Sequence, residues 1–480
     1  MSKINYFNHQ NKFVVYGLGI SGLSSIRFLA QNFSNELIAT NDDESVIKKV
    51  ETQLKNLPNS KTKIRFLKPQ DIDFDKNTII INSPGIPVLR PPHPILTKAL
   101  NNGAKIICDI ELFYHINNSH NFIAITGTNG KSTISTLIND VLQNIGLNSE
   151  LGGNIGVACF DLPQSKESKN YVLEISSYQI DLLKTAKFQI AALTNITPDH
   201  IERYGSFEHY CHSKKQIFAR QNKEDFAIIN IDNEPAQKIF NELQDDNNFQ
   251  SHLIPISTNK IIADGLSFID GVIYNNILHN KSQFKIKPKF LIGKHNAENI
   301  AIAFASIFCN IHKNYPDKLN SSSITKIISI IENFKGLKHR LQFLGKINDI
   351  AFYNDSKATN AKSTSFALKS CDNIFWILGG RSKSGGIDSL VPFFNKIKKA
   401  YLVGESSDDF AKILDKHNIS YEKCQIIEKA VKKAFIDAKN YSLSQKTILL
   451  SPACSSFDQW QNFEQRGNHF CEIFDKLATK

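Results

Sequence analysis

Short apolar runs rich in β-branched residues alternate with stretches of helical period along most of the chain. The runs fall into three sets, at 13–19, 78–85 and 105–110, at 122–127, 171–176, 190–196 and 226–232, and at 350–355, 374–380, 400–405 and 447–453. This alternation is typical of mainly parallel sheets covered by helices. We therefore expect an α/β protein of three domains, with residues 1–109, 110–336 and 337–480.

Length and composition exclude a single small module and extensive disorder. The chain has 480 residues, of which 41% are apolar and 21% charged, and its formal net charge is +11. Such a chain can bury large cores. The pI near 9.0 would suit nucleic acid, a membrane surface or an anionic small substrate, and the charge alone does not choose among them.

The cysteines and the apolar runs indicate a cellular compartment. The eight cysteines are never closer than 17 positions (454 to 471), so no CxxC metal or redox pair exists, and buried reduced thiols are expected. The first residues are polar and no apolar run reaches the length of a membrane span. We expect a cytoplasmic protein without a membrane span.

The first chemical motif is a glycine-rich turn, Gly17-Leu-Gly19-Ile-Ser-Gly22, which follows a strand and opens a helical stretch. Asp42 follows about twenty residues later, as in a dinucleotide-binding fingerprint. Because glycines allow close approach of the backbone to a pyrophosphate, a nucleotide-sugar diphosphate fits as well as NAD. The turn at Ser83–Ile86 is a second candidate contact, although an ordinary turn explains it equally well.

The second motif is stronger, FIAITGTNGKST at 122–133, between an apolar strand and a helical stretch. Its residues Gly127, Thr128, Asn129, Gly130, Lys131 and Ser132 form a phosphate loop, in which backbone amides cradle phosphates, the lysine neutralises charge and a hydroxyl can reach Mg²⁺. The motif departs from the common pattern because its first glycine is Gly127, whereas Ile125 occupies the usual position.

Polar residues end two of the following strands. Glu174 lies in the apolar run 171–176, where an unpaired charge would be costly. His200 follows the run 190–196, at a position where sheets of this class carry ligand groups. Beside a phosphate loop, the two residues together favour Mg²⁺ bound near ATP.

Several motifs together resemble one known family. GGNIG (152–156), LEISSYQ (173–179), TNITPDH (194–200), HNAENIAIA (295–303) and GLKHR (336–340) follow the phosphate loop in the order and spacing of the Mur ligases of bacterial peptidoglycan synthesis. NDSKATN (354–360), LGGRSKSGG (378–386) and LLSPACSSFDQWQNFEQRGNHF (449–470) are similar to the D-glutamate-adding branch. The resemblance extends from residue 13 to residue 470.

The resemblance implies a Rossmann-like nucleotide-sugar domain, a central ATPase-like domain and a Rossmann-like C-terminal domain that closes over ATP. It implies an ATP-dependent ligase that joins D-glutamate to UDP-N-acetylmuramoyl-L-alanine. The substrate carboxylate would attack the γ-phosphate of ATP, and the amine of D-glutamate would then displace phosphate from the acyl phosphate. Two Mg²⁺ sites, a monomer and no nucleic-acid partner are also implied.

Residue roles follow from the matched motifs. ATP would contact Gly127, Thr128, Asn129, Gly130, Lys131, Ser132, Asn299, Arg340, Asp355 and Lys357. The UDP-sugar would contact Ile20, Ser21, Asp42, Ser83 and Gly85, and Asn154 would contact γ-phosphate or substrate. D-Glutamate would contact Thr359, Lys383, Ser456 and Phe463. Metal would be held by Ser132, Glu174, His200 and Lys214, with Lys131, Glu174, His200 and Lys214 as the catalytic set.

The family uses a carbamylated lysine as a carboxylate-like metal ligand. In YCHSKKQIF (210–218), the spacing favours Lys214, although Lys215 is adjacent. Arg381 stands where related ligases often have a small or acidic residue, which leaves the electrostatics of the D-glutamate pocket open.

Other classes fit the sequence less well. Folylpolyglutamate synthase shares the phosphate loop but lacks the N-terminal diphosphate-binding domain, and sister Mur ligases differ in the motifs at 356–360 and 450–459. A nucleic-acid module would need a basic stripe with interleaved aromatics, which the sequence lacks. A dehydrogenase has no support beyond the first glycine turn.

Overall fold

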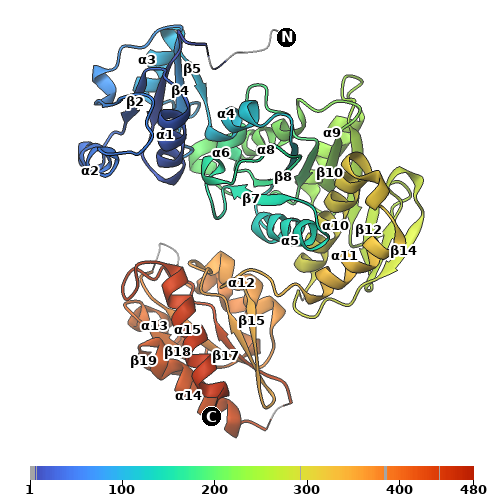
Figure 1. The fold of residues 1–480 in the computed structure, drawn as a ribbon. Helices are drawn as coiled ribbons and strands as arrows, with labels where there is room; N and C mark the ends of the chain where they lie inside the picture. Colours follow the sequence, from blue (N-terminus) through green and yellow to red (C-terminus); the bar gives the residue numbers. More distant parts are fainter. Residues whose placement is uncertain (1–5, 7, 292, 383–385, 443, 480) are drawn as a thin grey trace. The chain divides into compact units, whose positions relative to one another are not determined.

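The computed structural model describes residues 6, 8–291, 293–382, 386–442 and 444–479, which form two compact units. The first unit comprises Met1–Lys287 and Lys294–Ile331, and the second comprises Pro288–Gly293 and Glu332–Lys480. The first unit contains two sheets and the second contains one (Figure 1). The prediction of an α/β chain with mainly parallel sheets is confirmed.

The first sheet has five parallel strands in the order β3-β2-β1-β4-β5. Its strands are β1 (Lys12–Tyr16), β2 (Leu37–Thr40), β3 (Ile64–Phe66), β4 (Thr78–Asn82) and β5 (Lys105–Ile107), and its helices are α1 (Ile20–Asn32), α2 (Glu44–Leu54), α3 (Pro94–Asn101) and α4 (Asp109–Ile116). Since β1, β2 and β4 are buried along nearly their whole length, their continuous apolar sequences reflect a sheet covered on both faces.

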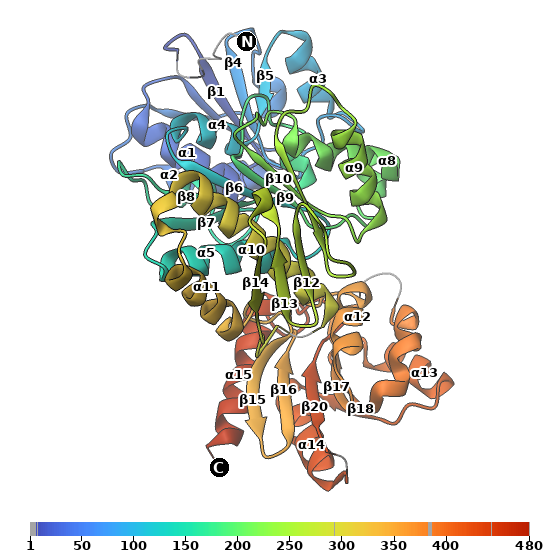
Figure 2. The ribbon, with the colours of Figure 1, turned by 90° about the vertical axis from the view of Figure 1, so that its right-hand side faces the viewer.

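The central sheet has nine strands in the order β14-β13-β12-β11-β10-β9-β6-β8-β7. The strands are β6 (Asn121–Thr126), β7 (Ser149–Gly153), β8 (Asn170–Glu174), β9 (Ile190–Leu193), β10 (Phe226–Asn230), β11 (His252–Ser257), β12 (Leu266–Ile269), β13 (Val272–Asn275) and β14 (Ser282–Lys285). Among the described pairings of this central sheet, only β12–β13 and β13–β14 are antiparallel. They extend one edge of the sheet as a meander (Figure 2).

Helices of very different length accompany this sheet. They are α5 (Lys131–Asn144), α6 (Ser177–Ile180), α7 (Ile201–Tyr204), α8 (Phe207–Lys215), α9 (Glu234–Gln244), α10 (Lys294–Asn314) and α11 (Ser321–Asn333). The helix α10 is buried along most of its length and packs beside α5 and across β9 to β12. The helices α6 and α7 are too short to cover a sheet, and they therefore serve as connections that position side chains.

The third sheet lies in the second unit and has six strands in the order β15-β16-β20-β17-β18-β19. Its strands are β15 (Gln342–Ile347), β16 (Ile350–Asn354), β17 (Ile374–Gly379), β18 (Ile397–Val403), β19 (Tyr421–Gln425) and β20 (Lys446–Leu450), and its helices are α12 (Ala361–Ser370), α13 (Ser407–Lys416), α14 (Ile427–Asn440) and α15 (Phe463–Ala478). Along β17, Trp376 and Leu378 enter one core while Phe375 and Ile377 enter the other, as the period of two in a strand requires.

The predicted strands are present, but several apolar runs end in turns rather than in strands. The run 13–19 becomes a strand only to Tyr16, and the run 190–196 only to Leu193. The remaining residues form the turns that begin the candidate sites. The strands β2, β3, β7, β11 to β15 and β19 were not predicted, because they are short or carry polar residues. The boundaries proposed at 109 and 336 stay predictions.

All eight cysteines are free, as expected, but Cys211 and Cys471 are only partly buried, so the expectation of uniformly buried thiols is wrong at these two positions. Both lie on helices whose outer faces meet solvent. Among the helices of the described residues, none combines the length and the hydropathy that a membrane crossing requires.

A buried carboxylate ties α4 to the central region of the first unit. Glu111 is fully buried and accepts hydrogen bonds from the amides of Lys184 (3.0 Å), Thr185 (2.9 Å) and Ala186 (3.0 Å). Burial alone would raise the pKa of this carboxyl, but the bonds from His115, Thr185 and the backbone together lower it to about 2. We expect Glu111→Gln to lower the free energy of unfolding by about 3 kcal/mol, as measured by urea unfolding.

The matched control is Glu44→Gln, because Glu44 at the exposed start of α2 pairs with Lys48 and Lys68 and should change the free energy of unfolding far less than Glu111 does. The pKa of Glu111 is lower in the folded protein than the unfolded value of about 4.3. Its stabilisation is therefore present above that value and is lost as pH falls from about 4 toward 2. Equal effects of the two substitutions would contradict the role of Glu111.

Candidate functional site

Most of the predicted site residues follow the carboxyl ends of adjacent parallel strands, and this holds in each of the three sheets. In the first sheet they follow β2, β1 and β4; in the central sheet they follow β7, β6 and β9, and Glu174 ends β8; in the third they follow β16 and β20. The exceptions are Lys214 in α8, Asn299 in α10, Arg340 before β15 and Phe463 in α15. Since ligands bind at the carboxyl edge of open α/β sheets, each sheet presents one candidate binding edge.

The phosphate loop connects β6 to α5, and two of its glycines are required by close contacts. Gly127 has φ +145°, and a Cβ there would lie 1.9 Å from Oγ1 of Thr194. Gly130 has φ +85°, and a Cβ there would lie 2.4 Å from Oδ1 of Asn299. The structure thus brings Asn299 against the loop. Lys131 begins α5, and its Nζ donates to the carbonyl oxygens of Gly127 and Thr128, each at 3.0 Å.

The loop is held by the segment after β9. The amide of Thr128 donates to Asn195 O (2.7 Å), and the amide of Asn129 donates to Oδ1 of Asn195 (3.0 Å). Thr194 Oγ1 donates to Asn129 O at 2.6 Å. Asn195 was not singled out from the sequence, although it lies inside the matched motif TNITPDH; only the pairing of β6 with β9 shows which loop it orders.

Glu174 is a buried carboxylate at the end of β8, and the two hydrogen bonds it accepts come from neutral groups. Ser132 Oγ donates to its Oε2 at 2.6 Å, and Asn154 Nδ2 donates to its Oε1 at 3.0 Å. None of the ion pairs in the described residues includes Glu174. A carboxylate beside a phosphate-loop serine suits a hard cation such as Mg²⁺, and the residues present therefore fit the implied metal.

The described residues contain no group of three or more His, Cys, Asp or Glu side chains that could hold a metal on their own. A metal here would therefore need further oxygen ligands, such as the hydroxyl of Ser132 and the phosphates of a nucleotide. This arrangement is common for Mg²⁺, which usually binds through one or two carboxylates and substrate phosphates.

His200 lies just before α7 with φ +53°, and its side chain is 42% exposed. Its ring lies 5.0 Å from the ring of Tyr178 and 6.2 Å from that of Tyr210, measured between centroids. Its Nε2 is 3.7 Å from a carboxylate oxygen of Asp199. The side chain is therefore oriented by aromatic neighbours and remains accessible to a ligand.

Lys214 is 1% exposed, whereas its neighbour Lys215 forms a 2.7 Å ion pair with Glu242 near the surface. Lys214 Nζ donates to Gly127 O at 2.9 Å, the same carbonyl that Lys131 contacts. Burial, and then the positive charge of Lys131, hold the pKa of the Lys214 ammonium well below its usual range. The two adjacent lysines therefore have different chemistry, and only Lys214 favours a neutral amine at the phosphate loop.

In the first sheet, the two glycine-bearing turns are packed against each other. A Cβ at Gly17 would lie 2.5 Å from Cβ of Ser83, whose Oγ donates to Gly17 O at 2.8 Å. Ile20 is 75% exposed at the start of α1, and Ser21 follows it. Asp42, which follows β2, accepts a hydrogen bond from the hydroxyl of Tyr16. Gly85 lies in the same turn as Ser83, so this group forms one continuous edge.

In the second unit, Asp355 is buried after β16 and accepts hydrogen bonds from Ser451 Oγ (2.7 Å) and from the amide of Leu341 (3.0 Å). Burial raises the pKa of this carboxyl to about 7, although these bonds and the charge of Arg340 lower it. Asp355 is therefore close to its protonation midpoint near neutral pH.

Two of the remaining predicted residues of this unit meet at the start of α15. Lys357 Nζ lies 4.0 Å from the ring centroid of Phe463, the first residue of α15. Thr359 follows Lys357 in the same loop, and Ser456 is buried in the loop after β20. Lys383 lies outside the described residues. Within this unit the structure thus brings together Lys357 and Phe463, which lie 106 positions apart in the sequence.

Two arginines of this unit have clear partners. Arg466 is fully buried on α15; its Nε donates to Ser356 Oγ at 3.0 Å and its Nη2 to Cys454 O at 3.0 Å, so it joins the loops after β16 and β20. Arg466 was not predicted from the sequence, because an arginine in a helical stretch is usually exposed to solvent. Arg381 forms a bidentate pair with Glu405, with two contacts of 3.0 Å, so its charge is compensated locally.

Three family models match the chain in order. They are the "Mur ligase MurD-like, N-terminal domain" at residues 11–108, the "Mur ligase middle domain" at 125–307 and the "Mur ligase, glutamate ligase domain" at 339–454. The chain belongs to the Mur ligase family. The resemblance of its motifs to this family is thus confirmed.

Curated relatives of this Mur ligase match it over nearly the full length. The UDP-N-acetylmuramoylalanine--D-glutamate ligase of Rickettsia bellii is 40% identical over 96% of this chain and 97% of its own. The enzyme of the same name from Rickettsia prowazekii is 40% identical over 98% of both chains, and that of Wolbachia pipientis is 36% identical over 99% and 98%.

Solved structures share the fold of this Mur ligase at low sequence identity. UDP-N-acetylmuramate-alanine ligase MurC from Thermotoga maritima has a TM-score of 0.55 and 14% identity, over 97% of this chain and 99% of that one. MurF from Acinetobacter baumannii has a TM-score of 0.53 and 15% identity, over 81% and 88%. These matches support the three-domain Mur ligase fold.

Proposed function

We propose that this Mur ligase joins D-glutamate to UDP-N-acetylmuramoyl-L-alanine, with cleavage of ATP to ADP and phosphate, in the synthesis of peptidoglycan precursor. The observation that carries the proposal is the phosphate loop with the buried pair Ser132–Glu174, in a chain about 40% identical, over nearly its whole length, to ligases of that name. All three sheets present a candidate binding edge, and all three proposed substrates are anionic.

The central edge would activate the substrate carboxylate. A carboxylate is a poor acyl donor until one oxygen becomes part of a good leaving group, so its attack on the γ-phosphate of ATP gives an acyl phosphate. Phosphoryl transfer needs mainly positioning and neutralisation of charge. Lys131 would supply positive charge to the phosphates, the loop amides would hold them, and Asn154 and Asn299 would contact the nucleotide or the substrate.

Magnesium, when bound, would neutralise the phosphates and the carboxylate that react. Ser132 and Glu174 would hold a first ion, and His200 with a carbamylated Lys214 would hold a second. The support is the set of neutral donors around Glu174, the accessibility of His200, and the burial of Lys214 beside the loop.

The second unit would supply D-glutamate and close the ATP site. In the proposed reaction, the D-glutamate amine attacks the acyl carbon, the tetrahedral intermediate collapses, and phosphate leaves. Thr359, Lys383, Ser456 and Phe463 would contact D-glutamate, while Arg340, Asp355 and Lys357 would contact the nucleotide. The edge of the first sheet, with Ile20, Ser21, Asp42, Ser83 and Gly85, would hold the uridine diphosphate. Domain boundaries near 109 and 336, a monomer and a cytoplasmic location belong to the same proposal.

The test is phosphate release from ATP and Mg²⁺ in the presence of UDP-N-acetylmuramoyl-L-alanine, with the amino acid varied. We expect D-glutamate to stimulate release about tenfold or more, because only the complete set of substrates turns over. L-Glutamate, L-alanine, L-lysine and diaminopimelate should have little effect, and omission of the UDP-sugar should abolish the stimulation. Equal turnover with L-glutamate, or dependence on DNA or RNA, would overturn the proposal.

A further inference from the structure

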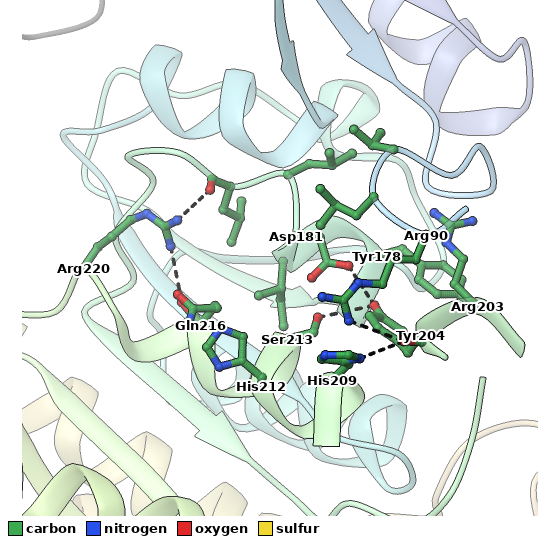
Figure 3. A pocket seen from close by; sticks show the side chains of 15 residues that line it. Arg90, Tyr178, Asp181, Arg203, Tyr204, His209, His212, Ser213, Gln216 and Arg220 are labelled. Carbon is green, nitrogen blue, oxygen red and sulfur yellow. Dashed lines mark hydrogen bonds between the residues drawn. The ribbon is translucent and has the colours of Figure 1, made fainter. Parts of the chain in front are cut away.

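Two arginines join the turn after β4 to the helix that follows His200, and they reach in opposite directions. From α7, Arg203 Nη1 donates to Gly85 O at 3.1 Å, and its Nη2 donates to Pro84 O at 3.2 Å and to Ile86 O at 3.3 Å. From the other side, Arg90 Nη1 approaches Tyr204 O at 3.5 Å (Figure 3). One guanidinium thus holds three carbonyls around a single tight turn.

Arg203 is also linked to His200. The backbone amide of Arg203 donates to His200 O at 3.0 Å, because His200 precedes the first residue of α7. The guanidinium of Arg203 lies 4.4 Å from the ring centroid of Tyr178 (Figure 3), and that ring lies 5.0 Å from the ring of His200. Arg203 therefore contacts both the 84–86 turn and the Tyr178 ring that lies beside His200.

The space next to these contacts is open rather than tightly packed. A pocket of about 220 Å³ lies between the loop 88–90, the segment 178–183 and the helix α8, and both Arg90 and Arg203 line it (Figure 3). Close packing would fix two segments through many apolar contacts. Beside this pocket, the hydrogen bonds of Arg203 connect the turn to α7.

We propose that Arg203 is a positioning residue that couples the turn 83–86, and hence binding of the UDP-sugar, to the placement of His200. The inference rests on the proposed function, because the turn matters only if it contacts the UDP-sugar. When the substrate orders the turn, Arg203 fixes α7, and α7 fixes His200. In this proposal Arg203 acts through the turn and through α7.

The test is Arg203→Gln, with kinetics measured separately for each substrate. Glutamine cannot reach three carbonyls and carries no charge, so we expect KM for the UDP-sugar to rise about tenfold and kcat to fall about tenfold. KM for ATP should stay within about twofold, because the phosphate loop is held by Thr194 and Asn195 instead. Arg203→Lys should recover part of the loss, since lysine keeps the charge but not the fork.

The matched control is Arg27→Gln. Arg27 on α1 also joins the first sheet region to the central one, because its Nη2 donates to both carboxylate oxygens of Asp161 at 2.9 Å, but away from the turn. It should leave all three kinetic constants near those of the wild type. Tyr178→Leu removes the ring contacts with Arg203, His200 and Tyr204 but leaves the hydrogen bonds of Arg203 to the turn, and should lower kcat with little change in KM for the UDP-sugar.

The outcomes separate the inference from the proposed function. If the wild type shows no phosphate release dependent on D-glutamate, the proposed function fails. If the wild type is active but Arg203→Gln matches Arg27→Gln, or raises KM for ATP as much as KM for the UDP-sugar, the coupling role of Arg203 is wrong. A calorimetric titration of each variant with the UDP-sugar alone would check that the change in KM is a change in affinity.

Discussion

Replacement of Lys131 by alanine is expected to abolish ligation while leaving affinity for the UDP-sugar nearly unchanged. The Lys131 ammonium lies at the first turn of α5, bonded to the loop carbonyls of Gly127 and Thr128, where the phosphates of ATP would bind. Loss of a positive charge that stabilises the transferred phosphoryl group costs about a thousandfold or more in kcat. The residues proposed for the UDP-sugar lie on the edge of a different sheet.

The measurement is phosphate release at saturating substrates, together with calorimetric binding of the UDP-sugar. Lys313→Ala is a suitable control, because Lys313 lies at the far end of α10 and its Nζ contacts Glu224 O. It should retain normal turnover. If Lys131→Ala lost binding of the UDP-sugar as well, the lysine would be needed for the fold or for a shared site, and its assignment to ATP alone would be wrong.

The sequence predicted the strand–loop–helix setting of the glycine-rich motifs, because that setting depends on local order along the chain. A glycine-rich loop after an apolar strand places amides at a sheet edge whatever the rest of the fold does. Gly17, Gly130 and Lys131 therefore have the expected local setting. The carboxylate of Glu174 was also predicted from its apolar strand, since a buried charge needs a partner.

Contacts between distant segments could not be predicted in the same way. Arg203 looks like a solvated residue of a short helix, and only the fold reveals the three carbonyls it contacts on a turn 117 to 119 positions away. Arg466 likewise joins two loops whose proximity follows from the order β16-β20-β17 in the third sheet. These residues gain their roles from strand order, which hydrophobic periodicity does not determine.

Lys214 and Lys215 provide the second large effect, and the structure distinguishes them more sharply than their spacing does. Carbamylation requires a neutral amine, which adds to CO₂ to give a carbamate anion and a proton. Burial, and then the positive charge of Lys131, lower the pKa of Lys214, whereas Lys215 is paired with Glu242. Lys214 can thus supply a neutral amine, and a carbamate there would place a negative charge beside the phosphate loop.

We therefore expect Lys214→Ala to lower kcat about a hundredfold to a thousandfold, as for the loss of a charge-stabilising group, and Lys215→Ala to stay near the wild-type value. Depletion of CO₂ and bicarbonate should slow the wild type and Lys215→Ala alike, and added bicarbonate should restore both. Acetate should return part of the activity of Lys214→Ala, because the vacated space can admit a small carboxylate. Normal turnover of Lys214→Ala together with inactivity of Lys215→Ala would reverse the assignment, and indifference of the wild type to CO₂ would exclude the carbamate.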